Sequence, residues 1–490
     1  MGNIGLFFTN RKTLVVLLSL GIAIAILSLW QREIGTDDAW LAEQAYWLVE
    51  DGHVRSELFY GMNHHHVRHL AYHRLYIWHG ALLYKLFGWS ADLFKSVSLL
   101  YFLLFLYVSR LYIKRHNIFK SATEYSVFYL LVFSFALMTK LSFIYRPDTM
   151  VMAFGLLSFY CLHLAIKEQN SQKAILSGLF AGLCVLTHLN GVAYVFAGGV
   201  IFLLHRYYRL LIYFSLASFV VSMFYFVEFR NWEMFGEFLY QLRSSPALSA
   251  KDFSITGSLL KFLSSYKSYF HKGSDASYTL LLFFVFWTQR KTILADQNLR
   301  LLFIYFLALA LGLALISPGA KSLYLVYHAP YAFLIIAVLY KQMFAQSSVQ
   351  QASFAFLLSV FLLTQWGGTI KLFNKRTPEL ESVNRMVSQS MGIPDGARII
   401  APITYVFDEI DKYTIQCFHV YRALSGQGVI RLVEDFFSVA SEDKRTHLIL
   451  TDHHLRDLHV QKPQQGQKFG QYIYEGKHGP YHGFKHVNVI

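Results

Sequence analysis

The sequence predicts a polytopic α-helical membrane protein with a small C-terminal α/β domain. Of the 490 residues, 55% are hydrophobic and 15% are charged, whereas about a quarter of the residues in soluble domains are charged. Apolar runs long enough to cross a hydrocarbon core of about 30 Å recur along the first three quarters of the chain. Only the last stretch has the composition of a water-soluble domain.

About eleven membrane spans are expected, and together they form a predicted transmembrane domain over residues 1–372. We place them near residues 13–30, 93–113, 124–140, 149–166, 174–188, 192–205, 210–228, 277–289, 300–317, 324–340 and 351–371. The first run resembles a signal peptide, but no small-residue cleavage site precedes the polar stretch that follows it. We therefore expect an uncleaved first span.

The basic residues predict how these spans are oriented. On the expected alternation, the following residues all fall on one side: Arg11, Lys12, Lys114, Arg115, Lys167, Lys173, Arg206, Arg209, Arg290, Lys291 and Lys341. The positive-inside rule makes that side cytoplasmic. The N-terminus is then cytoplasmic, and the loops 31–92 and 229–276 and the tail face outward. The net charge of +14 is explained by these loop residues, so we expect no nucleic-acid partner.

The outward-facing segments contain the predicted soluble structure. Residues 37–49 and 73–88 read as two interfacial amphipathic helices within the loop 31–92. The predicted C-terminal domain, residues 373–490, shows "ARIIAPITYVF", a helical "VIRLVEDFFSVA" and "THLILTD". This strand, helix, strand order is typical of a small α/β domain.

Two adjacent carboxylates, Asp37 and Asp38, follow the first span directly. A carboxylate at the membrane surface, partly shielded from water, can act as a general base toward a hydroxyl. The alternative is helix capping, because Asp in a first turn meets the positive end of the helix dipole.

A second acidic position lies in "YRPDTM", at the outer end of another expected span. Asp148 is therefore on the same side as Asp37, and Arg146 accompanies it. The fork of donors on an Arg binds phosphate oxygens in a bidentate manner. The alternative is a structural Arg–Asp pair at a helix start set by Pro147.

A run of histidines in "NHHHVRHLAYHRLYIWH" lies between these two sites. We expect His65, His66, Arg68 and Arg74 to contact phosphate or sugar hydroxyls. A divalent metal is the alternative, because histidines four residues apart share one face of a helix. We expect no cofactor to be required.

The segment "SPGAKSLYLVYHAPY" supplies further candidates at the outer mouth of a late span. Lys321 can hold a lipid phosphate as a point charge, with Tyr324, Tyr327 and His328 beside it. The alternative is that the Lys snorkels and the Tyr residues belong to an interfacial aromatic belt.

Taken together, "GTDDAW", "RPD", "GLFAGLCVLTHLNG" and "GAKSLYLVYHAPY" resemble the integral-membrane glycosyltransferases of the GT-C class. The likeness is to the bacterial protein O-mannosyltransferase and aminoarabinose transferase group in particular, and it runs from about residue 10 to residue 345. The resemblance implies a GT-C-like fold and transfer of one sugar from a polyprenyl-phosphate carrier to a glycan, lipid or protein acceptor.

The resemblance also assigns residues. The catalytic base of the family maps onto Asp37, and its second acidic site onto Asp148. Asp38 stands where the family more often has Glu. Inversion at the anomeric carbon is expected, because no second carboxylate is placed as a nucleophile. The expected location is the bacterial inner membrane, and the absence of an N-x-Ser/Thr acceptor agrees with a bacterial source.

Two other classes of membrane protein compete with this interpretation. A transporter or flippase for a lipid-linked glycan would need charged groups and broken spans at mid-depth, and His188 with Asn190 is the best feature for it. A phosphoethanolamine transferase would need a metal-binding soluble domain larger than the predicted tail.

Overall fold

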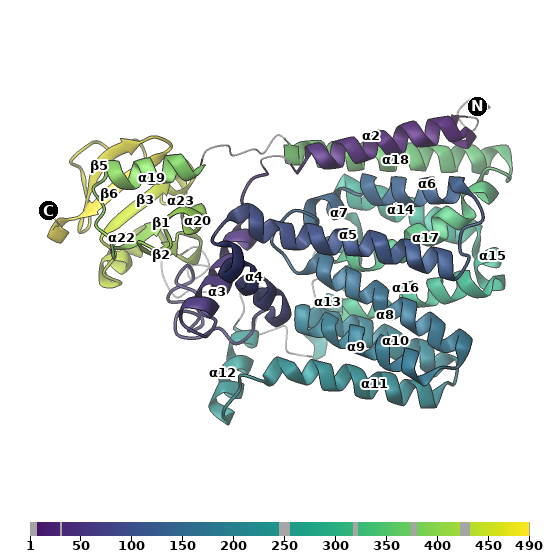
Figure 1. The fold of residues 1–490 in the computed structure, drawn as a ribbon. Helices are drawn as coiled ribbons and strands as arrows, with labels where there is room; N and C mark the ends of the chain where they lie inside the picture. Colours follow the sequence, from purple (N-terminus) through teal and green to yellow (C-terminus); the bar gives the residue numbers. More distant parts are fainter. Residues whose placement is uncertain are drawn as a thin grey trace.

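A computed structural model describes residues 7–29, 32–244, 255–316, 322–373, 380–421 and 432–489. A bundle of long helices forms one end of the molecule, and a mixed sheet flanked by helices forms the other (Figure 1). The N-terminus lies at the end of the bundle that is distant from the sheet (Figure 1). The predicted combination of a mostly helical protein and a C-terminal unit of helices and strands is therefore confirmed.

The helices of the bundle and of its outer loops follow one another with short breaks. They are α2 (Arg11–Leu27), α3 (Thr36–Glu50), α4 (Arg74–Phe87), α5 (Ala91–Arg115), α6 (Ala122–Ser134), α7 (Ala136–Leu141), α8 (Asp148–Glu168), α9 (Ser171–Thr187), η1 (Leu189–Gly191), α10 (Val192–Leu204), α11 (Tyr208–Met223), η2 (Phe224–Phe226), α12 (Trp232–Arg243), α13 (Ile255–Ser264), η4 (Ser265–Phe270), α14 (Gly273–Thr288), α15 (Arg290–Ala295), α16 (Gln297–Ile316), η5 (Ser322–Tyr324), α17 (Leu325–Met343) and α18 (Ser348–Phe373).

Within the described residues, six helical segments are long and apolar enough to cross a membrane: Ala91–Arg115, Asp148–Glu168, Tyr208–Phe226, Gln297–Ile316, Ser322–Met343 and Ser348–Phe373. The other expected spans coincide with shorter helices, so the expected number of about eleven stays a prediction. The run 124–140 is broken, because α6 ends at Ser134 and α7 restarts at Ala136. Gln365 of α18 accepts the backbone N–H of Ala136 at 3.0 Å, which satisfies a donor that the break would leave without a partner.

Local sequence explains several helix starts. Asn170 caps α9 by accepting the backbone N–H groups of Gln172 and Lys173, as an Asn at this position is expected to do. Pro147 precedes α8 and fixes the backbone where the helix begins. The two helices predicted within the loop 31–92 are present as α3 and α4, and their position at the membrane interface stays a prediction. Ala45 of α3 is fully buried against protein and therefore does not face lipid.

Because successive helices alternate in direction, the segments that we predicted to face outward lie at one end of the bundle. The ends of α5, α8 and α10 and the short helix α15, which carry or adjoin the basic residues, lie at the end distant from the sheet (Figure 1). The segments 32–90, 142–147 and 188–191 lie at the opposite end, which faces the C-terminal sheet (Figure 1). Both acidic positions therefore lie at the same end of the bundle.

The C-terminal unit contains α19 (Leu380–Ser390), β1 (Arg398–Ala401), η6 (Ile403–Tyr405), α20 (Val406–Glu409), β2 (Thr414–Cys417), α22 (Leu432–Glu442), β3 (His447–Thr451), α23 (Asp452–Asp457), β4 (Lys468–Phe469), β5 (Tyr472–His478), β6 (Tyr481–His486) and η7 (Val487–Val489). The strand order is β2-β1-β3-β6-β5-β4. Strands β2, β1 and β3 are parallel, and the other pairs are antiparallel. The predicted order of β1, a helix and β3 is confirmed.

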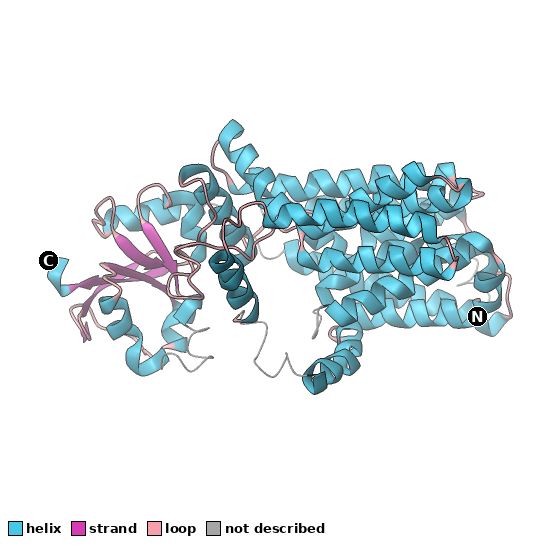
Figure 2. Ribbon diagram, turned by 90° about the horizontal axis from the view of Figure 1, so that it is seen from below, coloured by secondary structure: helices cyan, strands magenta, loops and turns pink. Residues whose placement is uncertain are grey.

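The sheet unit packs directly against the outer loop of the bundle (Figure 2). Leu58 accepts the backbone N–H of Cys417 at 3.0 Å. The ring of Trp89 stacks on Phe407 with 5.5 Å between centroids, and its Nε1 donates to the carbonyl of Val406 at 3.2 Å. These contacts join the first outer loop to the C-terminal unit through both backbone and aromatic groups.

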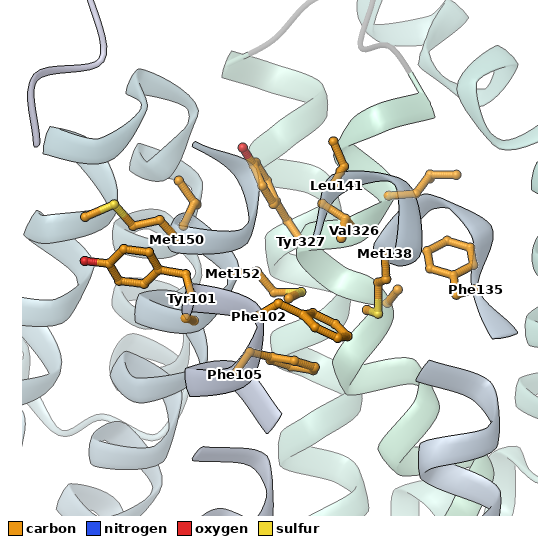
Figure 3. Packing of buried hydrophobic residues seen from close by; sticks show 14 of the residues in the cluster. Tyr101, Phe102, Phe105, Phe135, Met138, Leu141, Met150, Met152, Val326 and Tyr327 are labelled. Atoms are coloured by element: carbon orange, nitrogen blue, oxygen red, sulfur yellow. The ribbon is translucent and has the colours of Figure 1, made fainter. Parts of the chain in front are cut away.

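One part of the core of the bundle is built from large side chains of α5, α7, α8 and α17 (Figure 3). Phe105 of α5 and Met152 of α8 are almost fully buried there. Tyr327 of α17 belongs to the same buried cluster, and its hydroxyl oxygen lies at the upper edge of the group in Figure 3. The Tyr327 hydroxyl therefore lies at the edge of a group of close-packed apolar side chains.

The glycines of α9 to α10 give a test of this packing. A Cβ at Gly191 would lie 2.2 Å from the backbone carbonyl of Cys184, whereas a Cβ at Gly199 would have Leu211 at 3.8 Å as its nearest neighbour. We expect Gly191→Ala to cost about 1–3 kcal/mol, because the backbone must shift. Gly199→Ala is the matched control and is expected to be neutral or stabilising by up to about 1 kcal/mol. Thermal unfolding in detergent measures both variants, and equal stability of the two would contradict the packing described.

Candidate functional site

An ion triad stands at the end of the bundle that faces the C-terminal unit. Arg146 donates from Nη1 to Asp37 Oδ2 at 2.5 Å and from Nε to Asp148 Oδ2 at 2.8 Å. The side chain of Asp148 is fully buried, that of Arg146 is 15% exposed and that of Asp37 is 40% exposed. Asp37 is therefore the carboxylate of the triad that solvent or a substrate can reach.

Asp38 holds the backbone around this triad. Its Oδ2 accepts the N–H of Gly35 at 2.7 Å, and its Oδ1 accepts the N–H of Tyr145 at 2.5 Å. The residue is 1% exposed, and burial raises its pKa to about 6, although the Tyr145 N–H and the nearby Lys95 favour the charged form. Asp38 thus connects the start of α3 to the turn that carries Arg146. The contact of its Oδ2 with the Gly35 N–H is a helix cap, which is the alternative role considered from the sequence.

Tyrosines of α10, η5 and α17 close the buried side of the triad. The hydroxyl of Tyr327 donates to Asp148 Oδ1 at 3.2 Å, and the hydroxyl of Tyr194 donates to the Tyr327 carbonyl at 3.0 Å. The ring of Tyr324 lies 5.7 Å from that of Tyr327. The predicted candidates Asp148, Tyr324 and Tyr327 are therefore brought together.

Two histidines border the triad. The rings of His73 and His188 stack with 4.5 Å between centroids, and His188 also contacts Tyr324 edge to face. His188 Nδ1 accepts the backbone N–H of Asn190 at 3.0 Å, which places this pair in a local cap. His188 and Asn190, the residues that favoured a transporter in the sequence, are thus part of the surroundings of the triad.

A cavity of about 820 Å³ opens beside Asp37. Its lining comes from the start of α3, from α7, from the starts of α14 and η5, and from the end of α18: Arg32, Glu33, Gly35, Thr36, Asp37, Ala136, Leu137, Lys140, Ile144, Lys272, Gly273, Ser274, Asp275, Ser322, Leu323, Thr364, Gly367, Gly368, Lys371 and Leu372. Ligand cavities usually measure about 300–1,000 Å³. This one is large enough for a sugar and its phosphate.

The cations of this cavity were not found from the sequence. Lys272 precedes α14 and Lys371 lies in the last turn of α18, and both are exposed. Neither amine makes an ion pair within 4.0 Å in the described part of the chain. Arg32, by contrast, is buried and donates to the carbonyls of Thr139 and Lys140. Lys321 lies outside the described residues.

Two predicted phosphate-binding residues have partners elsewhere. The guanidinium of Arg74 is buried, pairs with Glu228 at 2.9 Å and stacks over Tyr72. His328 lies between the hydroxyls of Tyr269 at 3.2 Å and Tyr278 at 3.3 Å. The structure does not bring either side chain into contact with the triad.

The remaining candidates lie in the loop between α3 and α4. His65 stacks on His69 with 4.1 Å between ring centroids, and burial lowers the pKa of His65 to about 4. His66 lies against Tyr60, and Arg68 is half-buried with no hydrogen-bond partner for its Nε. Across the described ranges, no group of three or more His, Cys, Asp or Glu side chains is arranged to hold a metal ion. Both His65 and His66 would meet a ligand as neutral imidazoles.

Sequence reasoning missed Glu43, which organises this loop from α3. Its carboxylate accepts hydrogen bonds from the Ser56 hydroxyl at 2.6 Å, from the backbone N–H groups of Glu57 and Leu58 at 2.6 and 3.0 Å, and from Trp47 Nε1 at 3.2 Å. Glu43 is 1% exposed, and burial raises its pKa to about 7. Because Leu58 contacts the C-terminal unit, Glu43 also supports that interface.

Comparison with solved structures identifies the fold. ArnT from Cupriavidus metallidurans bound to undecaprenyl phosphate is similar with a TM-score of 0.59 and 12% identity, over 96% of this chain and 97% of that one. The oligosaccharyltransferase of Archaeoglobus fulgidus in the apo form gives 0.57 and 11%, over 90% and 70%. AglB of the same organism, in complex with an inhibitory peptide and a dolichol-phosphate, gives 0.53 and 10%, over 88% and 69%.

These similarities confirm the predicted resemblance to GT-C class membrane glycosyltransferases over nearly the full chain. The fold is ArnT-like, with multiple apolar helices and a C-terminal mixed sheet. No known family model and no curated protein matches the sequence.

The buried carboxyl of Glu43 gives a prediction about stability and pH. A raised pKa means that the folded state binds more protons than the unfolded state between about pH 4.5 and pH 7. Stability should therefore fall as pH rises through that window, by an amount on the order of 2–3 kcal/mol. Glu43→Gln should remove this part of the pH dependence, because an amide can still accept the backbone donors and donate to Ser56.

Thermal unfolding of the native chain and of Glu43→Gln, each at pH 5 and pH 8 in detergent, measures the difference. Glu43→Leu is the contrasting variant and should be strongly destabilised at both pH values, because it leaves the buried donors without partners. An identical pH dependence in the native chain and in Glu43→Gln would show that Glu43 is not the titrating group.

Proposed function

We propose that the chain is an inverting glycosyltransferase that moves one sugar from a polyprenyl-phosphate donor to an acceptor hydroxyl at the outer face of the membrane. The observation that carries this proposal is one cavity in which the accessible carboxylate of Asp37 and the amines of Lys272 and Lys371 are lining groups. A base and a set of cations are the two kinds of group that such a transfer requires. The lipid phosphates bound in the ArnT and AglB structures support the choice of donor.

The proposed step requires a base on the chain, an acceptor hydroxyl and the lipid-linked donor. Asp37 accepts the proton of the acceptor hydroxyl, and that oxygen attacks the anomeric carbon from the face opposite the phosphate. The bond from the anomeric carbon to the phosphate oxygen breaks, and polyprenyl phosphate leaves with one additional negative charge. The configuration at the anomeric carbon inverts, because a single displacement occurs.

Arg146 and Asp148 are proposed to orient the base. Two nitrogens of the guanidinium are already engaged by carboxylates, and Tyr327 fixes the other oxygen of Asp148. A rotamer of Asp37 that is held in this way loses little entropy when the acceptor binds. Direct binding of the donor phosphate by Arg146 stays a prediction, and the described geometry supports the orienting role better.

The donor phosphate is proposed to bind the lysines of the cavity. Lys272 and Lys371 come from the start of α14 and the end of α18, two helices that pack against each other. Their charges can compensate the negative charge that develops on the leaving phosphate. Lys321, predicted from the sequence, is adjacent to the cavity-lining Ser322 and is proposed to join them.

The wider assignment follows from the proposed reaction. We propose a transmembrane catalytic domain over residues 1–372 and an extracytoplasmic domain over residues 373–490. The expected setting is a bacterial inner membrane, with the N-terminus in the cytoplasm.

Asp37→Asn tests the base. Transfer of sugar from a radiolabelled polyprenyl-phosphate donor should fall by about 10²- to 10⁴-fold, because the amide cannot accept the proton. The fold should persist, because an amide oxygen can still accept from Arg146.

The matched control is Asp92→Asn, which removes a carboxylate on the same side of the bundle that is 81% exposed and belongs to the start of α5. This control should keep the native rate. Undiminished donor turnover by Asp37→Asn would mean that another group is the base.

Lys272→Gln combined with Lys371→Gln tests the phosphate site. The loss of two cations should lower kcat/KM for the lipid-linked donor by about tenfold or more, at roughly 1 kcal/mol for each charge. Lys85→Gln, which removes an exposed lysine near the end of α4, is the control and should leave kcat/KM unchanged. Equal values for the native chain and the double variant would place the phosphate elsewhere.

A further inference from the structure

A second hollow of about 420 Å³ lies on the bundle between α14 and α16, and it is lined almost entirely by apolar side chains. Its lining residues are Tyr269, Tyr278, Thr279, Leu282, Phe283, Phe286, Trp287, Arg290, Phe303 and Leu307. Phe286 contacts Phe303 across the hollow with 5.0 Å between ring centroids. Phe283 and Trp287 remain 64% and 60% exposed in the chain alone. This groove therefore offers an open aromatic surface on the membrane-facing part of the molecule.

Both walls of the groove end in an arginine at the same end of the bundle. Arg290 follows α14, donates to the Trp287 carbonyl at 3.0 Å and stacks over the Trp287 ring at 4.7 Å. On α16, Arg300 precedes Phe303 and Leu307 at spacings of three and four, so the three residues share one face. Lys291 adds a third exposed cation.

The acidic group nearest to these cations in sequence is Asp296, and it has a structural role. Its Oδ1 accepts the backbone N–H of Leu299 at 2.9 Å, at the start of α16. The end of the groove thus keeps an excess of positive charge, whereas the rest of the groove is apolar. An amphiphile with an anionic head and an alkyl chain matches this distribution.

The dimensions favour a lipid of one leaflet. From Tyr278 to Trp287, the α14 wall extends roughly 14 Å at 1.5 Å per residue. Half of a hydrocarbon core is about 15 Å thick. The Arg290 end is also a full helix away from Lys272, which precedes α14 at the cavity of Asp37. A phosphate at Arg290 is therefore distinct from the donor phosphate.

The other end of the groove contacts residues that lead to the triad. Tyr269 and Tyr278 line the groove, and their hydroxyls are hydrogen-bonded to the two ring nitrogens of His328. His328 follows Tyr327, which donates to Asp148. An alkyl chain packed against these two tyrosines would restrict the rings that position His328.

We propose that this groove binds an anionic glycerophospholipid, with one acyl chain between α14 and α16 and the phosphate at Arg290 and Arg300. The orientation predicted from the basic residues places this head group in the cytoplasmic leaflet. The proposal does not depend on the reaction assigned to Asp37, because it concerns a different surface and a different phosphate.

Photo-crosslinking in vesicles tests the proposal. The full-length chain is reconstituted in phosphatidylcholine vesicles that contain a trace of phosphatidylglycerol with a photoreactive acyl chain, and parallel vesicles contain phosphatidylcholine with the same chain. Crosslinks to Phe283, Phe286 and Phe303, mapped by peptide mass spectrometry, should be stronger with phosphatidylglycerol by about fivefold for each arginine engaged.

Arg290→Gln combined with Arg300→Gln should remove this preference. The matched control, Arg206→Gln with Arg209→Gln, takes one basic residue from the turn after α10 and one from the first turn of α11, at the same end of the bundle, and should keep it. Equal crosslinking by the two lipids in the native chain, or an unchanged preference in Arg290→Gln/Arg300→Gln, would overturn the proposal. Displacement of the crosslink by added polyprenyl phosphate would also overturn it, because the groove would then hold the carrier tail.

Discussion

The arrangement of the site depends on one buried cation shared by two carboxylates. Arg146 lies between Asp37 and Asp148, and two of its nitrogens are hydrogen-bonded to them. A guanidinium that is 15% exposed requires such partners, because burying a charge without a partner is costly. This requirement fixes the first turn of α3 against the first turn of α8, although 109 residues separate Asp37 from Arg146. The accessible carboxylate is thereby held at the edge of a cavity.

The alternating helices supply the other components of that cavity. Lys272 and Lys371 are distant in sequence, and both line the cavity because the start of α14 and the end of α18 come together where these two helices pack against each other. The break between α6 and α7 places Lys140 on the same wall. The proposed phosphate-binding groups thus come from helix ends, whereas the carboxylate comes from the loop 31–92. The interface of that loop with the C-terminal sheet, organised by Glu43, makes the C-terminal unit part of the support for the site.

The sequence was sufficient to predict the class of fold and the acidic positions. Apolar runs, basic turns and the order of motifs predicted helices at the right places and put Asp37 and Asp148 at one end. The lysines of the cavity could not be predicted, because Lys272 and Lys371 read as ordinary residues at span ends until α14 and α18 are seen to be neighbours. Arg74 and His328 were predicted to bind phosphate, but the structure pairs Arg74 with Glu228 and His328 with Tyr278. These partners could not be recognised from the sequence, because they become neighbours only when the helices pack. The β5–β6 hairpin also escaped prediction, although Gly479 and Pro480 mark its turn.

The most direct test of the central claim is a structure of the chain with polyprenyl phosphate bound. We expect the phosphate to lie in the cavity of about 820 Å³, within hydrogen-bonding distance of Lys272 or Lys371 and on the side of the cavity that faces Asp37. A phosphate bound outside this cavity, with the triad of Asp37, Arg146 and Asp148 intact and remote from it, would contradict the proposed binding of the donor beside Asp37.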